Sequence, residues 1–229
     1  MAVILNIETS TDVCSVALSR DGEVLEHYEN YEGNSHSTAL APMVRDALSY
    51  AATREIKLDA VAVSQGPGSY TGLRIGLSQA KGLAFGLDVP LIGVQTLELL
   101  VVSTMFNHFI EDEVLYAPMI DARRMEVYTG LYNNALESVM APCAMVLDEG
   151  SFGNVLSECK VVFCGNGSDK AKNVIKSENA MWIGGVKPVA VDMVALAEKA
   201  WREKRFVDVA YSTPVYLKDF VATKPKKLL

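Results

Sequence analysis

The sequence predicts an α/β fold built from two related units, and three observations support this prediction. Short apolar runs alternate with helical periodicities along the first half of the chain, in the order βββ, α, β, α, β, α. The stretch 120–131, in which an acid ends an apolar strand before an alternating strand, echoes the stretch 7–18. An apolar strand also enters a glycine turn twice, at 61–69 and at 161–168. Together these patterns indicate a duplicated β-sheet unit with helices between its strands.

Length and charge limit the classes of protein to which the chain can belong. With 229 residues, half of them apolar, it can bury the core of one large domain or of two small ones. The net charge of −7 argues against a chain that grips nucleic acid by itself, because such binding depends on neutralising phosphates. Only the tail is locally basic, through Lys218, Lys224, Lys226 and Lys227, and a solvated end accounts for it.

The sequence shows neither a targeting signal nor a metal-ligand pattern. Its start, MAVILNIETS, has no basic leader, and no stretch reaches the ~20 apolar residues of a membrane span, so we expect a cytoplasmic protein without membrane contact. The four cysteines form no CxxC pair, and the three histidines lack the helical spacing that would join two in one metal site. We therefore expect reduced thiols and no cofactor bound by this chain.

The chain begins with a predicted three-stranded meander over residues 3–9, 14–19 and 23–31. Between the first two strands lies Glu8-Thr9-Ser10. Acid and hydroxyl side chains at such a turn can hold a phosphate or a hydrated magnesium ion, but turns are also rich in these residues because they satisfy their own backbone. Alone, this turn supports either interpretation.

A strand, a glycine turn and a helix follow one another in the stretch 64–88. The turn contains Gly66, Pro67, Gly68 and Ser69, and the helix is predicted to begin near Ser69 or Thr71. Glycine permits a close backbone approach, and a hydroxyl can cap the first free amides of the helix. The turn therefore offers amides at a positive helix end, which suits an anion, and with Glu8-Thr9-Ser10 it forms a candidate anion pocket.

The helix after this turn carries pairs of glycines four residues apart. Each interior glycine costs about 1 kcal/mol relative to alanine, so a compensating close contact is expected. The pairs are Gly72 with Gly76, which Ala80 extends, and Gly82 with Gly86. Two interpretations are open: the stripe docks another subunit, or it packs tightly inside the chain's own core.

A helix is also predicted after a break at 33–34, with Ser35 or Ser37 as its cap and Pro42 in its first turn. Its apolar positions form a broad face, which hints at a partner as well as a core. These positions are Leu40, Met43, Val44, Ala47, Leu48, Tyr50 and Ala51.

The sequence predicts a strand over 89–94 and a helix capped by Thr96, and this helix is taken as the connection between the units. The predicted units are residues 1–98 and 99–229, with a C-terminal segment that can pack back on the first. A helix over 192–204 is expected to end the second unit, before a last extended piece at 213–217.

Six blocks of sequence, spread in order over essentially the full length, resemble the bacterial TsaB proteins. The blocks are ILNIETSTDVCSVAL, HSTALAPMVRDAL, SQGPGSYTGLRIGLSQAKGLA, DARRMEVYTGLY, FCGNGSDK and TPVYLKD. The GPGSYTGLRIG block is the most specific of them. The resemblance implies a duplicated fold like that of actin, Hsp70 and sugar kinases (RNase H-like), which agrees with the internal echo.

The resemblance also implies a role in making threonylcarbamoyladenosine in tRNA. In the wider family, TsaD-like paralogues transfer the threonylcarbamoyl group to the adenosine beside the anticodon (position 37) of tRNAs that read ANN codons. Those paralogues have an HxxxH metal pair on the first helix, whereas here His36 is followed four residues later by Leu40. A lone histidine cannot make that site, so we expect no catalytic residue in this chain.

The resemblance implies that TsaB-like proteins bind and activate a TsaD-like catalytic paralogue through the helices of the first unit. A TsaE-like ATPase belongs to the same complex, ATP and metal are expected on the partner subunits, and contact with tRNA is expected to be indirect. Without the partner, a homodimer through the same face is expected. Mapped by motif, the partner-binding residues are His36, Leu40, Met43, Val44, Ala47, Leu48, Gly72, Leu73, Gly76 and Ala80.

Two departures from the family pattern weaken a nucleotide site. Glu8 stands where an aspartate is common, and the turn after it has no glycine, so Glu8, Thr9, Ser10, Gly66, Gly68 and Ser69 are interpreted as a vestigial anion pocket. The alternative function is an ATPase or kinase of the same fold that uses Glu8, Asp121 and the glycine turns. A peptidase, an older label of the family, lacks support because no catalytic triad is discernible, and Cys14 with His36 is better read as a buried thiol near a histidine.

Overall fold

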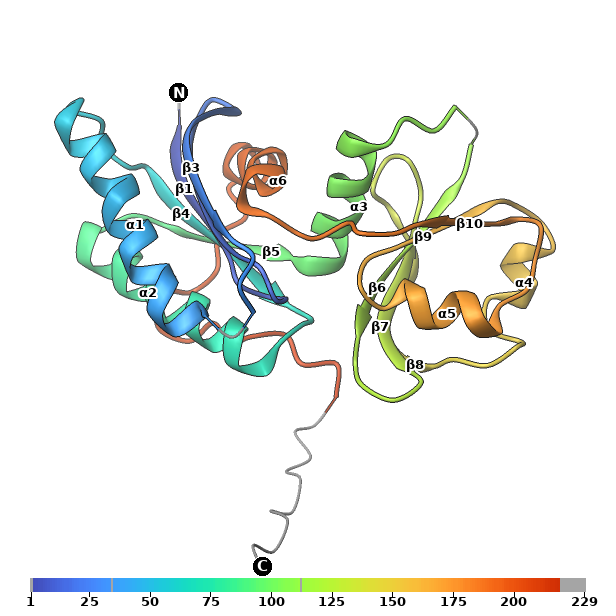
Figure 1. The fold of residues 1–229 in the computed structure, drawn as a ribbon. Helices are drawn as coiled ribbons and strands as arrows, with labels where there is room; N and C mark the ends of the chain where they lie inside the picture. Colours follow the sequence, from blue (N-terminus) through green and yellow to red (C-terminus); the bar gives the residue numbers. More distant parts are fainter. Residues whose placement is uncertain (1, 34, 112, 219–229) are drawn as a thin grey trace, which may run out of the picture.

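The computed structural model describes residues 2–33, 35–111 and 113–218, and it shows two five-stranded mixed sheets side by side (Figure 1). The first sheet has the order β3-β2-β1-β4-β5, and the second has the order β10-β9-β6-β7-β8. The strands of the first sheet are β1 (Val3–Glu8), β2 (Cys14–Arg20), β3 (Glu23–Asn30), β4 (Ala60–Gly66) and β5 (Leu91–Gln95). Those of the second are β6 (Leu115–Asp121), β7 (Glu126–Tyr132), β8 (Ser138–Val146), β9 (Val161–Cys164) and β10 (Ala180–Ile183).

The two sheets have the same topology, which confirms the predicted duplication. In each, an antiparallel meander supplies three strands, and two further strands join in parallel beside the first strand of that meander. The echoed pairs occupy equivalent places, because Glu8 ends β1 and Asp121 ends β6. β1 and β4 are buried along their whole length, as continuous apolar strands of a covered sheet are expected to be.

Two helices cover each face of the first sheet. The helices α1 (His36–Thr53) and α2 (Tyr70–Leu87) share one core with the odd-facing side chains of β1 and β4, such as Leu5 and Val61. On the other face, α3 (Thr96–Asn107) and α6 (Ala190–Arg202) pack against Ile4, Ala62 and Ile92. The second sheet carries α4 (Gly153–Leu156) and α5 (Ser168–Val174) on one face and α3 on the other. α3 therefore lies between the sheets, and the boundary predicted near residue 98 falls inside it.

The placement of α6 corrects a prediction. The sequence assigned this helix to the end of the second unit, but its apolar residues Met193, Leu196 and Ala197 pack on the first sheet. Its first amide, on Ala190, donates to Ser15 Oγ at 2.9 Å. Both sheets offer a similar apolar face, so helical periodicity alone could not say which sheet this helix covers.

The helix caps agree with the sequence only in part. Ser69 caps α2 as predicted, since Gly72 N donates to its Oγ at 3.2 Å. Ser35 occupies the cap position of α1, but its hydroxyl donates to Glu32 O instead of accepting from a helix amide. Thr96 is the first residue of α3, not its cap, and its buried Oγ1 has no partner among the described residues.

The residues after α6 return to the first unit as a segment that we call the strap, residues 205–218. Val207 bridges to Leu91 at the edge of β5, and Val215 N donates to Gln65 O at 2.7 Å. The predicted extended piece at 213–217 lies in this strap and pairs at the end of β4 without forming a regular strand. The lysines at 224, 226 and 227 lie outside the described residues. Among the described helices, none is long and apolar enough to cross a membrane.

Candidate partner-binding face and anion pocket

The start of α2 is pressed against the turn after β1. A Cβ atom built on Gly72 would lie 2.1 Å from Thr9 O, and one on Gly76 would lie 2.1 Å from Thr9 Oγ1. Thr9 Oγ1 in turn donates to Gly72 O at 2.8 Å. These glycines are therefore required by packing within the chain, the second of the two interpretations that the sequence left open.

This packing encloses much of the predicted partner-binding set. Most of its members are buried in the chain's own core and can affect a partner only by holding the helices in place: His36, Leu40, Val44, Ala47, Gly72, Leu73, Gly76 and Ala80. The His36 ring is held by Val13, with Nε2 3.2 Å from Val13 O. Met43 and Leu48 are only partly buried and remain at the surface.

The second pair of glycines on α2 has a different environment. A Cβ on Gly82 or Gly86 would meet nothing within 4 Å, and both residues are exposed. Phe85 lies between them with 82% of its surface exposed, and Leu87 follows at 47%. The sequence pattern did not distinguish the two glycine pairs, because spacing reports a shared helix face and not what that face meets. The last turns of α2 thus present an apolar surface that nothing in the described chain covers.

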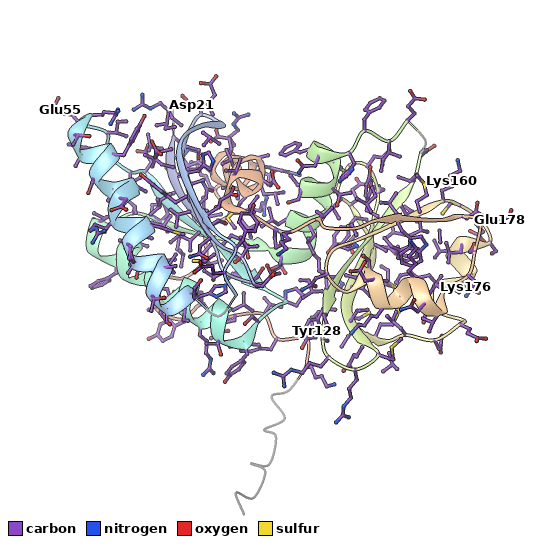
Figure 2. All side chains as sticks on the ribbon, in the orientation of Figure 1. Asp21, Glu55, Tyr128, Lys160, Lys176 and Glu178 are labelled. Carbon is purple, nitrogen blue, oxygen red and sulfur yellow. The ribbon has the colours of Figure 1, made fainter. Side chains whose placement is uncertain are left out.

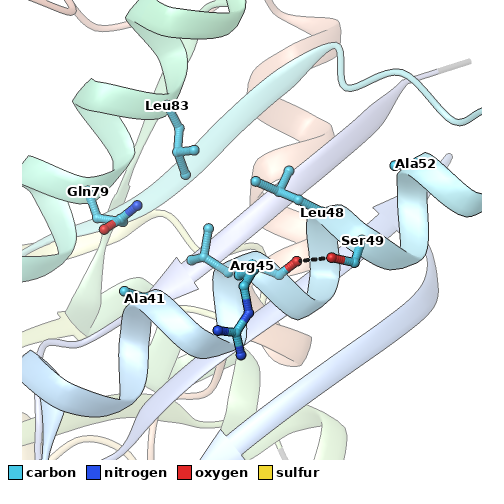
Figure 3. Close-up of a pocket in the computed structure, with 8 residues that line it drawn as sticks. Ala41, Arg45, Leu48, Ser49, Ala52, Gln79 and Leu83 are labelled. Carbon is cyan, nitrogen blue, oxygen red and sulfur yellow. Dashed lines mark hydrogen bonds between the residues drawn. The ribbon is translucent and has the colours of Figure 1, made fainter.

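A groove runs between α1 and α2 on the same outer layer (Figure 3). Its volume is about 420 Å³, and its walls come from both helices: Ala41, Val44, Arg45, Leu48, Ser49, Ala52, Gln79 and Leu83. Figure 3 shows Leu48 and Leu83 projecting into the space between the helices. On the α1 wall, the Ser49 hydroxyl donates to Arg45 O at 2.8 Å. Small or apolar side chains thus make up most of its lining, together with Gln79 and the guanidinium group of Arg45.

The predicted anion pocket is filled from within the chain. Ser69 N donates to Ser10 O at 2.7 Å, and a Cβ on Gly68 would lie 2.3 Å from that same oxygen. Gly66, with φ +112°, fits against Val215 O of the strap, 2.7 Å from its Cβ position. Backbone carbonyls therefore occupy the place where an anion would meet the helix amides. The glycines permit this close contact between the turns.

The buried carboxyl group of Glu8 also argues against an anion at this place. Its carboxyl group is fully buried and accepts from Ser10 N and Ser10 Oγ through Oε1, while Oε2 has no partner among the described residues. Burial raises the pKa of Glu8 to about 7, against the opposing hydrogen bonds from Ser10. A second negative group placed beside this carboxyl would raise its pKa further and repel it when ionised. The site favours a shielded, partly protonated acid.

The equivalent end of the second unit differs in exposure. Asp121 is exposed, its Oδ1 accepts from Lys170 Nζ at 2.6 Å, and its backbone amide donates to Asn166 Oδ1 at 2.9 Å. The turn after β9 packs on β6 as the turn after β4 packs on the β1 end, with Gly167 N donating to Met119 O. Glu8 and Asp121 are thus engaged separately, and the described residues hold no group of three potential metal ligands.

One set of contacts was missed by sequence reasoning. Tyr216 of the strap stacks on Tyr70 with ring centroids 5.2 Å apart, and Arg74 Nε lies 3.1 Å from Tyr216 OH. Lys218 forms an ion pair with Glu126 of the second unit. The block TPVYLKD drew attention to these positions, but no local pattern indicates a contact between residues so far apart in the sequence.

Two equivalent α/β units joined in one chain define a protein of the actin-like fold class. Comparisons place it more narrowly. The family model described as TsaD, tRNA N6-adenosine threonylcarbamoyltransferase, matches residues 30–227. The chain belongs to this family, and within it to the TsaB proteins.

The relatives cover almost the whole chain. The tRNA threonylcarbamoyladenosine biosynthesis protein TsaB of Escherichia coli is 34% identical over 96% of both chains. Its namesake in Bacillus subtilis is 34% identical over 94% of this chain and 93% of that one. A Pseudomonas aeruginosa crystal structure, described as an uncharacterized protein with similarity to peptidase YEAZ, superposes with a TM-score of 0.81. It is 29% identical and covers 95% of this chain and all of that one.

Proposed function

We propose that this chain acts in the biosynthesis of threonylcarbamoyladenosine in tRNA as a non-catalytic subunit that binds and activates a TsaD-like catalytic paralogue. The observation that carries the proposal is the outer face of α1 and α2. This face has an open groove, exposed Phe85 and Leu87, and two glycines with free space above them. Exposed apolar surface of this kind marks a protein interface more often than a solvent face.

The interior of the chain supports an accessory role. The turns at which an actin-like enzyme would hold phosphate are packed against one another, and Glu8 is enclosed. His36 bonds to a backbone carbonyl, and Leu40, four residues later, is buried in the core, so the position one turn after this imidazole carries no metal ligand. ATP and metal then belong to the partner subunits, and a TsaE-like ATPase is the third component that the family resemblance suggests.

The proposed interface differs from the one expected from sequence. It consists of the groove residues Ala41, Leu48 and Leu83, half-buried Met43, and the exposed end of α2 with Gly82, Phe85 and Gly86. The buried residues of α1 and α2 set the angle of the two helices. Activation is then the stabilisation of a competent shape of the paralogue, whose product is the modified adenosine at position 37 of ANN-reading tRNAs.

Co-purification tests the proposal. The chain is co-expressed with the TsaD-like protein of its own organism and recovered through one affinity tag, as wild type and as Gly82→Leu and Leu48→Glu. We expect both substitutions to reduce recovery of the partner at least tenfold, because they fill free space or bury a charge at the interface.

The matched control is Ser37→Leu, an exposed position at the other end of α1 and outside the groove. Each variant is checked for an unchanged thermal unfolding midpoint. Full partner recovery with folded Gly82→Leu and Leu48→Glu contradicts the proposed face, and no recovery with wild type contradicts the partnership. Sedimentation of the pure chain then tests the homodimer, which the partner should dissociate if both use the same face.

A further inference from the structure

Five cations lie along a path of contacts from α2 of the first unit to the β6–β7 turn and α5 of the second, although the chain as a whole is acidic. We call this surface the basic seam and define it by Arg74, Arg123, Arg124, Lys170 and Lys218. Arg74 lies on α2, Lys218 ends the described part of the strap, and the remaining three come from the β6–β7 turn and α5. Figure 2 labels Tyr128 of β7, which marks the side of the second unit that faces the first.

Hydrogen bonds and ion pairs connect the elements that carry these residues. Arg74 Nε lies 3.1 Å from Tyr216 OH, and Lys218, two residues along the strap, pairs with Glu126 of β7. Two residues of extended chain span about 7 Å, so the strap carries the seam from one unit to the other. Lys170 Nζ donates to Arg124 O at 2.9 Å and so joins α5 to the β6–β7 turn.

The charge along the seam is unbalanced. Two carboxylates bond to lysines of the seam: Asp121 pairs with Lys170, and Glu126 pairs with Lys218. Arg123 and Arg124 are exposed, and within the described ranges neither side chain has an ion-pair partner. The guanidinium groups of three arginines thus face solvent, and a guanidinium is suited to bidentate contacts with phosphate.

Aromatic rings stand beside these charges. Tyr216 is 42% exposed and lies against Tyr70, and the Arg74 guanidinium lies 4.0 Å from the centre of the Tyr70 ring. A partly exposed ring that is fixed by a second ring and a cation can stack an unpaired base. Phosphate-binding arginines next to such a ring are the combination by which proteins bind single-stranded RNA loops.

We propose that the basic seam binds the phosphodiester backbone of RNA, with an unpaired base stacked on Tyr216. That this RNA is tRNA rests on the function proposed above. The net charge of −7 opposes binding by the isolated chain, so the seam contributes to RNA affinity once a partner holds the RNA near it. The expectation of indirect tRNA contact is then replaced by a direct contact at one edge of the molecule.

The test measures anisotropy of a fluorescent tRNA transcript titrated with the purified complex of this chain and its catalytic paralogue. We expect Arg123→Gln/Arg124→Gln to weaken binding about tenfold at moderate salt and to reduce the slope of log K against log salt by about 1–2, as for one or two lost phosphate contacts. Both arginines have positive φ, so glutamine is used because it removes the charge without a β-branched side chain that would strain this backbone.

The control is Arg54→Gln/Lys57→Gln, which removes the same charge at the far end of the first unit, beside the labelled Glu55 in Figure 2. Arg54 lies 3.7 Å over the Tyr50 ring and so also controls for an arginine on a tyrosine. Equal weakening by the control, or unchanged affinity and salt slope in the seam variant, overturns the proposal.

A second arm replaces tRNA with fluorescent ATP. A seam variant that loses ATP binding while keeping tRNA affinity identifies a free nucleotide as the ligand and overturns RNA binding. Partner recovery is recorded for every variant before the titration. A complex that assembles but loses RNA affinity only in the seam variant supports the inference, and this outcome is distinguishable from failure of the proposed partnership.

Discussion

Glu8 is the residue whose chemistry departs most from what its place in the sequence suggests. It ends a buried strand, has one oxygen engaged by Ser10 and leaves the other without a described partner. Its pKa is raised to about 7 from 4.5, chiefly by burial. Because the folded state binds the proton more tightly than the unfolded state, stability from the neutral acid is fully present below pH 4.5 and is lost as the pH rises through 7.

This sign predicts the behaviour of Glu8→Gln. The variant keeps the oxygen that accepts from Ser10 and removes the charge, so its free energy of unfolding should exceed that of the wild type by an amount that grows between pH 4.5 and 7. Above pH 7 the gain levels off at about 3 kcal/mol, the equivalent of the shift. Urea unfolding of both proteins at pH 5, 6, 7 and 8 measures the difference. A gain that is constant across these pH values would refute the prediction.

At the scale of the element, α2 combines two kinds of glycine in one helix. Gly72 and Gly76 let the helix lie on Thr9, whereas Gly82 and Gly86 have free space. The first pair orients the helix. The second pair leaves the outer face of the helix without side chains at two positions, so another backbone can approach closely. The same spacing in the sequence thus has two structural causes.

Alanine substitutions separate these causes. Gly76→Ala should lower the free energy of unfolding by about 2 kcal/mol, since its Cβ would overlap Thr9 Oγ1 by more than the gain in helix propensity offsets. Gly82→Ala should raise it by about 1 kcal/mol in the isolated chain. Denaturant unfolding measures both. Thr9→Ala in the Gly76→Ala background should recover part of the loss, and equal effects at positions 76 and 82 would contradict the distinction.

At the scale of the molecule, the strap and α6 join parts of the chain that are distant in sequence. α6 covers one face of the first sheet together with α3. The strap passes the edge of this sheet before it reaches Glu126 of the second unit. Lys81 of α2 fastens the strap, because its Nζ donates to Ala210 O at 2.8 Å and to Ser212 O at 3.0 Å. The architecture therefore depends on a few long-range contacts in addition to the two cores.

Loss of the two hydrogen bonds from Lys81 to the strap should be detectable by limited proteolysis. We expect Lys81→Met to lower the free energy of unfolding by about 1–2 kcal/mol, the worth of hydrogen bonds from a charged donor, and to make residues 208–216 the first site of cleavage. Limited proteolysis with mass spectrometry identifies the cut. Lys57→Met, which removes an exposed lysine elsewhere, is the control. Unchanged cleavage in Lys81→Met would show that other contacts hold the strap.

Local patterns predicted much of this fold, and the limits of those patterns are specific. The meander, the strand and turn before α2, and the Ser69 cap follow from alternation and turn chemistry, which act within a few residues. The sheet covered by α6 and the contact of Tyr216 with Tyr70 do not, since both depend on partners far along the chain. The proposed face shares its two helices, Met43 and Leu48 with the set expected from the sequence, whereas the exposed end of α2 was not in that set.

By itself the sequence determined the class of elements, the duplicated order of the strands and the family resemblance, because periodicity and turn residues are properties of neighbouring positions. Tertiary structure decided which side chains can act. It buried Gly72, Gly76 and most of the apolar face of α1 inside the chain, and it filled the anion pocket with the carbonyls of Ser10 and Val215. Exposure is set by what packs on a residue, and only the folded chain specifies that neighbour.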